Sequence, residues 1–106
     1  MTAQKFRELA LKIPGAIEAE HMGHPDFRVN GKIFASLGYP DDAHGMVGLT
    51  PEQQAEMLKK EPDVFKPCAG VWGKHGATNV HLGSAKVGVI RAALKAAAQN
   101  RAAERR

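Results

Sequence analysis

Residues 27–37 read FRVNGKIFASL, and this stretch decides the fold because it holds the clearest hairpin signal in the chain. Asn30 and Gly31 both tolerate a positive φ, so they suit the centre of the tight turn that joins two antiparallel strands. Residues 26–29 and 32–37, on either side of this pair, are rich in apolar and β-favouring side chains. The stretch therefore predicts two antiparallel strands with a two-residue connection.

A further strand and a helix are expected before this hairpin. Residues 17–22 alternate Ile, Ala and His with Glu, Glu and Met, which is the period of a half-buried strand. Residues 3–13 place Phe6, Leu9, Ala10 and Ile13 at the spacing of one helical face. Thr2 can cap this helix, and the Pro-Gly pair at 14–15 ends it.

After the hairpin, residues 46–49 predict a short strand and residues 51–60 predict a helix. Thr50 is its cap, Pro51 takes the first helical position, and Gln53 can complete a capping box. Its apolar face is narrow, made mainly of Ala55 and Leu58, so we expect a surface helix with one side docked.

The last third of the chain predicts a loop, a strand and a helix. Residues 63–76 contain a short extended piece and then a glycine-rich loop that holds Trp72. Residues 77–82 alternate as a strand, with Thr78 on the same face as Val80 and Leu82. Ser84 can cap the last helix, whose apolar stripe consists of Val87, Ile90, Leu94 and Ala97 or Ala98.

These elements predict an α+β fold, a two-layer sandwich of an antiparallel sheet with helices on one face. The length of 106 residues suits a single domain, 1–106, with 99–106 as a frayed tail. One cysteine, Cys68, excludes an intrachain disulfide and fits a reducing compartment. No segment has the roughly 20 apolar residues that span a bilayer, so we expect a cytoplasmic protein with no membrane partner.

The residue types that carry catalysis or bind metal form no strong constellation. His21 and His24 could share a turn but have no third ligand nearby, and Cys68 with His75 lacks the setting that activates a thiol. Glu18 and Glu20 predict a solvated strand face rather than an acid–base pair. The glycines match no phosphate-binding fingerprint. We therefore expect no enzyme activity, no metal and no cofactor.

The basic side chains are unevenly distributed along the chain. Residues 85–106 carry six Lys and Arg against a single Glu, whereas the rest of the chain is almost neutral. This asymmetry favours a polyanionic partner, the alternative being a merely solvated helix. The candidate contacts to nucleic acid are Arg28, Lys32, Trp72, Lys74, Lys86, Arg91 and Lys95. We expect Trp72, the only Trp, to pack in the core; the alternative is that it stacks on a base.

Four segments resemble the MmcQ/YjbR family of small bacterial proteins. They are IPGAIE at 13–18, FRVNGKIFASL at 27–37, VGLTPEQQAEML at 47–58 and WGKHGATNVHLG at 72–83, and the resemblance spans residues 4–98. It implies the order α-β(3)-α-β(2)-α, a double-wing fold related to secretion chaperones, and DNA binding. It implies no catalytic residues.

Three functions follow from these observations. The first is a nucleic-acid-binding module that uses the last helix and the hairpin. The alternative is a protein-interaction or chaperone-like module without nucleic-acid binding. The third is an enzyme or small-ligand binder built around His21, His24 and His75, which would need a formed pocket. The oligomeric state does not follow from the sequence.

Overall fold

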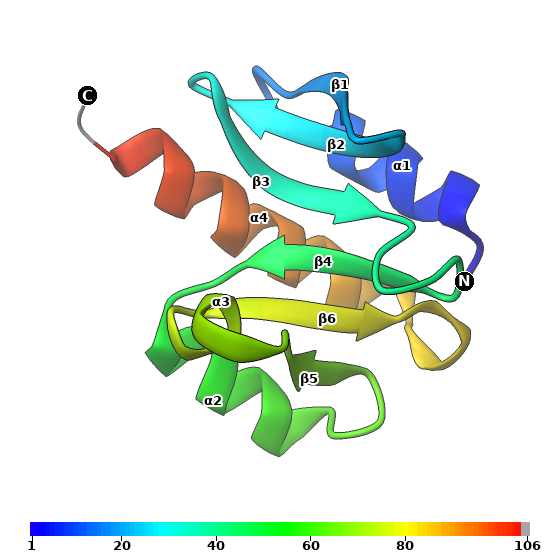
Figure 1. Cartoon of the computed structure of the whole chain (residues 1–106), viewed down its shortest axis with the longest axis vertical. Helices are drawn as coiled ribbons and strands as arrows, with labels where there is room; N and C mark the ends of the chain where they lie inside the picture. Colours follow the sequence, from blue (N-terminus) through cyan, green and yellow to red (C-terminus); the bar gives the residue numbers. More distant parts are fainter. Residues whose placement is uncertain (105–106) are drawn as a thin grey trace.

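The computed structural model describes residues 1–104 and contains one antiparallel sheet of six strands, in the order β1-β2-β3-β4-β6-β5 (Figure 1). The elements are α1 (Ala3–Leu11), β1 (Ile17–His21), β2 (His24–Val29), β3 (Lys32–Leu37), β4 (His44–Gly48), α2 (Pro51–Lys60), β5 (Phe65–Pro67), α3 (Gly70–Lys74), β6 (Ala77–His81), a 3-10 turn (Leu82–Ser84) and α4 (Val87–Ala103). The predicted α+β class and two-layer arrangement are confirmed. Four strands precede α2, as the residue patterns predicted, whereas the order implied by the family resemblance had three; the short α3 is additional.

The hairpin of β2 and β3 forms as the sequence predicts, with one irregularity. Asn30 and Gly31 have φ values of 57° and 73°, so both take the left-handed conformation that the turn requires. The register then shifts, because Arg28 pairs with Ile33 whereas Phe27 pairs with Ala35. Phe34 is thus the extra residue of a β-bulge. Beyond this bulge, each residue of β3 points to the face of the sheet opposite to the one it would take in a regular strand.

One face of the sheet is covered by α1 and α4, which lie behind it in Figure 1. Helix α4 buries an apolar stripe against the sheet, made of Ile90, Ala93, Leu94, Ala97 and Ala98. Helix α1 adds Phe6, Leu9 and Ala10 to the same core. Since few aromatic side chains are available, aliphatic residues fill most of this layer. Of the helices within residues 1–104, α3 alone lies on the opposite face of the sheet (Figure 1).

The start of α2 confirms the predicted capping box. The Thr50 hydroxyl accepts a hydrogen bond from the backbone N–H of Gln53, and the Gln53 side chain accepts one from the backbone N–H of Thr50. The predicted docking side is right for Leu58, which packs against the core, and wrong for Ala55, which is exposed; Gln54 is the buried residue. Polar carbonyls face this side of α2, so an amide rather than a methyl group is stabilised there.

Gln54 connects α2 to the two elements that follow it. Its amide nitrogen lies 3.0 Å from the carbonyl oxygen of Gly73, 3.1 Å from that of Ala77 and 3.1 Å from the hydroxyl of Thr78. Gly73 belongs to α3, while Ala77 and Thr78 begin β6. The position of α3 on the sheet therefore depends on one buried side chain of α2.

Helix α3 falls where the sequence predicted a loop, and it corrects the expectation for Trp72. Gly73 faces the backbone of Cys68 so closely that a Cβ atom would lie 1.9 Å from the Cys68 carbonyl oxygen. Successive residues of a helix are rotated by about 100°, so Trp72 cannot face the same way as Gly73. Its side chain is 76% exposed rather than packed in the core.

The beginning of α4 also differs from the prediction. Lys86 is the N-cap residue and no side chain caps the helix. Ser84, the predicted cap, belongs to the preceding 3-10 turn and forms a hydrogen bond of 2.9 Å with Nδ1 of His81. The chain therefore needs two more residues to turn into the helix than the Ser84 signal suggests.

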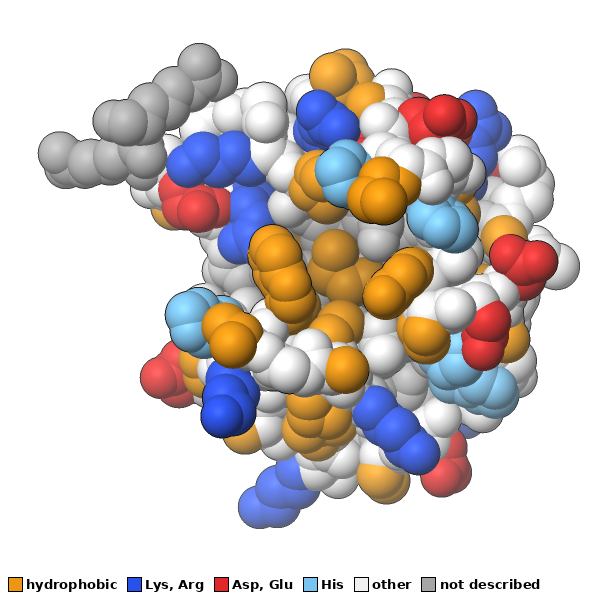
Figure 2. Space-filling model, in the orientation of Figure 1, with side chains coloured by type: hydrophobic (Ala, Val, Ile, Leu, Met, Phe, Trp, Pro, Cys, Tyr) orange, Lys and Arg blue, Asp and Glu red, His pale blue; other side chains and the backbone are white. Residues whose placement is uncertain are grey.

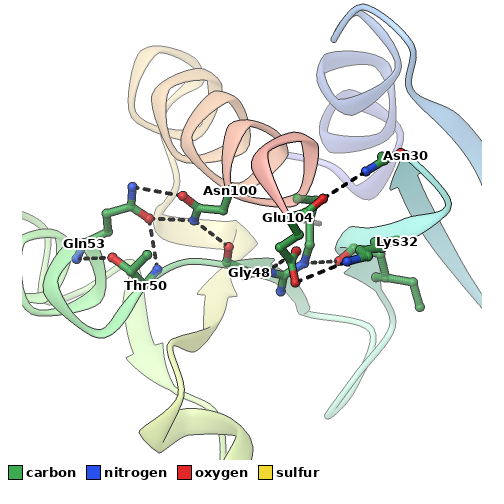
Figure 3. A network of polar contacts seen from close by, with 9 residues as sticks. Asn30, Lys32, Gly48, Thr50, Gln53, Asn100 and Glu104 are labelled. Carbon is green, nitrogen blue, oxygen red and sulfur yellow. Dashed lines mark hydrogen bonds and ion pairs between the residues drawn. The ribbon is translucent and has the colours of Figure 1, made fainter. Parts of the chain in front are cut away.

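The end of α4 is held by polar contacts (Figure 3). Asn100 donates to the carbonyl oxygen of Gly48 at 3.1 Å and to the side chain of Gln53 at 2.7 Å. Arg101 donates from Nε to the carbonyl oxygen of Ile33 at 2.8 Å. The frayed tail was predicted from residue 99, whereas the helix runs to Ala103; residues 105–106 lie outside the described part. Within that part, no helix is long and apolar enough to cross a bilayer.

A substitution at Gly73 tests the close approach of α3 to the sheet. Gly73→Ala places a methyl group against a backbone carbonyl that cannot move aside, and we expect a loss of more than about 2 kcal/mol in the free energy of unfolding. The matched control is Gly88→Ala, because no atom lies within 4 Å of the added methyl group in the first turn of α4. We expect the control to be neutral or stabilising by up to about 1 kcal/mol. Urea denaturation measures both, and equal effects would contradict the packing described.

A second substitution tests the hydrogen bonds of Gln54. Gln54→Ala removes an amide donor that three oxygen atoms of α3 and β6 share, while the Gly73 and Ala77 carbonyls keep their bonds from backbone N–H groups, so we expect a loss of about 1–3 kcal/mol in the free energy of unfolding. Gln99→Ala removes the same side chain from an exposed position of α4, where we expect a change within about 0.5 kcal/mol. Thermal unfolding by circular dichroism compares the two variants. If Gln54→Ala were as stable as Gln99→Ala, Gln54 would not hold α3.

Candidate functional site

The candidate site lies on the face of the sheet that α1 and α4 leave uncovered. Side chains alternate between the two faces along each strand, and partners on neighbouring strands share a face. One row of partners crosses this open face from β1 to β5, consisting of Ala19, Asp26, Ser36, Met46, Asn79 and Lys66. The bulge in β3 brings Ile33 to this face beside the row, where it lines the same hollow as Ser36.

A groove of about 570 Å³ occupies the middle of the open face. Figure 2 shows it as a hollow floored by apolar side chains, with basic and histidine side chains around it. Tyr39, from the loop after β3, and Trp72, from α3, both line the groove and are 67% and 76% exposed. Ile33 and Met46 contribute to its lining from the strands. Two aromatic rings from separate elements thus border one apolar hollow.

The acidic residue of the groove lining belongs to a fixed ion pair that is neutral overall. Asp26 is the only acidic residue that lines it, and this residue is 1% exposed. Both carboxylate oxygens of Asp26 accept hydrogen bonds from Arg28, at 2.8 and 3.1 Å. These bonds raise the pKa of Arg28 further above its ordinary value, so the guanidinium stays charged. The pair holds a cation in a defined place on the open face.

The two glutamates of β1 point the other way. Glu18 pairs in register with Phe27, a core residue, and forms an ion pair with Arg7 of α1. Glu20 lies two residues further along and therefore shares that face. The period of two in β1 thus removes both carboxylates from the open face, and the strands place no exposed acidic side chain there.

Cys68 lies on the groove and is a poor nucleophile there. Its Sγ donates a hydrogen bond of 3.1 Å to the side-chain oxygen of Asn79. Burial raises the pKa of the Cys68 thiol above its usual value, so the reactive thiolate is scarce at neutral pH. His75, its candidate base, follows α3 and lines a neighbouring hollow with Lys32 and Arg101 instead.

The histidines form two cross-strand pairs at one end of the open face. His21 faces His24 in the register of β1 and β2, and His44 faces His81 in that of β4 and β6, with ring centroids 5.5 Å apart. Asp41 lies 2.7 Å from Nδ1 of His44, and this hydrogen bond lowers the pKa of Asp41. Within residues 1–104, no three His, Cys, Asp or Glu side chains gather as a metal site would require.

The structure separates the basic residues that the sequence grouped together. Arg91 and Lys95 lie on the outer side of α4, where they line a hollow against α1 and not the open sheet face. Arg28 is on the open face, and Lys74 is exposed on α3, two residues after Trp72. The remaining two lie at the margins: Lys32 lines the hollow beside Trp72 and forms an ion pair with Glu104, and Lys86 lines a cleft with His44 and His81.

Three residues of the groove did not stand out in the sequence. Tyr39 lies in a loop rich in Gly, Pro and Asp, where an aromatic side chain is the only apolar group of any size. Met46 and Asn79 lie on the faces of β4 and β6 opposite the core residues Val47 and Val80. The alternation in these strands was a usable signal, but only the sheet order shows that the two residues are neighbours.

Comparisons with known proteins identify the family. No curated protein matches the sequence significantly. The fold is similar to the crystal structure of DR2400 from Deinococcus radiodurans, which contains a DUF419 domain, with a TM-score of 0.73 and 18% sequence identity over 91% of this chain and 75% of that one. At that identity the likeness shows the fold alone. The YjbR family model matches residues 11–99, most of the chain and each segment on which the resemblance rested, so the chain belongs to the YjbR family.

Proposed function

We propose that this protein binds nucleic acid, single-stranded DNA in the first instance, on the open face of the sheet. The observation that carries the proposal is the pair of exposed aromatic rings, Tyr39 and Trp72, on an apolar groove. Exposed rings on a sheet offer stacking platforms for bases, and stacking tolerates any sequence because every base has a π-face. Single exposed apolar side chains are ordinary, but exposed rings that border one apolar hollow mark an interaction site.

The charges of the open face support the same partner. Lys66 and Lys74 are exposed near the groove, whereas the charge of Arg28 is balanced by Asp26. Exposed carboxylates, which would repel phosphates, are absent from the strands of this face. The groove favours a single strand because a duplex keeps its base faces stacked inside. Arg91 and Lys95, on the far side of the sheet, are not part of this proposed interface.

We also propose that the role is binding rather than catalysis. The Cys68 thiol is protonated at neutral pH because its pKa is raised, and the Asp26 carboxylate is engaged by Arg28. Neither group is therefore suited to act as nucleophile or general base. A cytoplasmic location, which stays a prediction, is in keeping with a free thiol at position 68.

A protein partner is the second candidate. The exposed large apolar side chains of residues 1–104 are Ile17, Met22, Tyr39, Val71 and Trp72. Three of them line the groove and Ile17 shares the open face with Arg28. An apolar patch of this kind also marks protein interaction sites. Binding to such a partner would depend weakly on salt, whereas binding to a polyanion weakens steeply as salt rises.

Substitution of Trp72 tests the proposed interface directly. We expect Trp72→Ala to weaken binding of a labelled thymidine oligonucleotide by about tenfold, because a base–aromatic stack contributes about 1–3 kcal/mol. Trp72→Phe keeps a ring and should lose less than about threefold by the same argument. Fluorescence anisotropy at low salt measures the affinities. Since Trp72 is exposed, thermal unfolding should be nearly unchanged in both variants.

The matched control is the double variant Arg91→Gln with Lys95→Gln. It removes two cations from the far side of the sheet, and we expect affinity to change by less than about threefold. Full affinity in Trp72→Ala together with loss in the double variant would move the interface to α4. No binding by the unaltered protein at low salt would exclude the function.

Chemical modification of Cys68 provides an independent test. At pH 7.5 we expect iodoacetamide to alkylate Cys68 more slowly than free cysteine, because burial raises the pKa of the thiol. Saturating oligonucleotide should slow the reaction further, since Cys68 lies on the groove. Mass spectrometry of the single-cysteine chain follows the rate. An oligonucleotide that binds without protecting Cys68 would place the ligand elsewhere.

A further inference from the structure

A second hollow adjoins the groove, at the β5 side of the open face. This cleft measures about 670 Å³, a size typical of small-ligand sites. Its basic and histidine lining residues are His44, Lys60, Lys66, His81 and Lys86. They come from β4, α2, β5, β6 and the residue that precedes α4. Residues distant in sequence therefore converge on one concave surface.

The cleft and the groove share a wall. Asn79 lines both hollows. In the sheet register Asn79 lies between Met46, in the groove, and Lys66, in the cleft. Neighbouring strands are about 4.8 Å apart, so the backbones of these outer two positions are separated by about 10 Å. This distance is of the order that separates a base from the phosphates of its own strand.

Acidic and basic side chains line different sides of the cleft. Glu61 and Asp63 line it from the turn between α2 and β5. The sheet side carries Lys66, His44 and His81, and no acidic residue. The Asp41 carboxylate is bonded to Nδ1 of His44, so Lys66 is the cation of the sheet side that has no acidic partner in the part of the chain that the structure describes.

Two of the three lysines that line the cleft are available to a ligand. Lys60 forms an ion pair with Glu56 at 3.0 Å. Lys66 and Lys86, both exposed, make no ion pair within residues 1–104. Unpaired ammonium groups above a concave surface attract a phosphate without the loss of an existing pair.

The histidine rings are oriented by partners on one side. Nδ1 of His44 is bonded to Asp41, and Nδ1 of His81 is bonded to Ser84. Each ring is thereby fixed, and its Nε2 can donate to a phosphate oxygen when the ring carries a proton on both nitrogens.

From this arrangement we infer that the cleft binds the phosphate groups of the strand whose bases lie in the groove, with Lys66 and Lys86 as the principal contacts. The identity of the ligand rests on the proposed function. The assignment of the two hollows does not rest on it: the groove suits flat apolar rings, and the cleft suits phosphate. The chain of the nucleic acid would run across Asn79, from Trp72 toward Lys86.

The salt dependence of oligonucleotide binding tests this inference. On a single strand, each phosphate neutralised contributes about 0.7 to the slope of log affinity against log salt. The double variant Lys66→Gln with Lys86→Gln should therefore flatten the slope by about 1.4. The control Lys12→Gln with Lys95→Gln removes the same charge from the hollow between α1 and α4 and should leave the slope unchanged. A slope that changes equally in both variants, or only in the control, would overturn the inference.

A probe without bases separates this inference from the proposed function. We expect tripolyphosphate to shift the backbone amide signals of Lys66, His81 and Lys86 in a two-dimensional NMR spectrum, and the shifts to disappear in Lys66→Gln with Lys86→Gln. The indole signal of Trp72 should stay unmoved. If oligonucleotides fail to bind while these shifts appear, the proposed function fails and the phosphate site stands. Shifts confined to the α1–α4 hollow, or none, would exclude the phosphate site even where oligonucleotides bind.

Discussion

The packing of α4 on the sheet determines which face of the sheet is closed and which stays open to a ligand. Five apolar side chains of this helix are buried against the strands, which closes one face and leaves the other without a covering layer. An antiparallel sheet can keep one face toward water when that face is polar. Here the open face is instead apolar at its centre, around Met46 and Ile33, and carries exposed rings at its margin. That departure from the ordinary pattern favours a ligand-binding role for this face.

Local chemistry made part of this structure predictable from sequence. The Asn30-Gly31 turn and the Thr50 cap depend on φ preferences and on hydrogen bonds between residues three apart, so a few letters suffice. Trp72 and Gln54 depend instead on what lies opposite them. Gly73 lies against the Cys68 carbonyl, which turns Trp72 outward, and the carbonyls of α3 and β6 draw Gln54 inward. No local pattern carries that information.

The distribution of charge around the candidate site could not be predicted from local sequence either. Residues 85–106 are basic as a segment, yet the last helix uses one side for packing, and its Arg91 and Lys95 face away from the groove. Residues 1–84 look neutral as a segment, yet the strand period sends Glu18 to the helix side. Charge summed along a chain therefore says little about charge on a face, because each element distributes its residues over two sides. The sheet register, which the sequence does not reveal, makes the difference.

The arrangement of the open face also bears on how a strand could be held without sequence preference. Stacking on a ring and pairing with an ammonium group are both indifferent to base identity, and in the proposed complex the groove would provide the first interaction and the cleft the second. Recognition of particular bases would need donors and acceptors fixed at the floor of the groove. The Asp26 carboxylate is nearly inaccessible and already accepts two hydrogen bonds from Arg28, and the Asn79 oxygen accepts one from Cys68. The Ser36 hydroxyl and the Asn79 amide nitrogen are among the groups of the lining left to meet a base edge, so any base preference of the proposed complex would depend on such side chains.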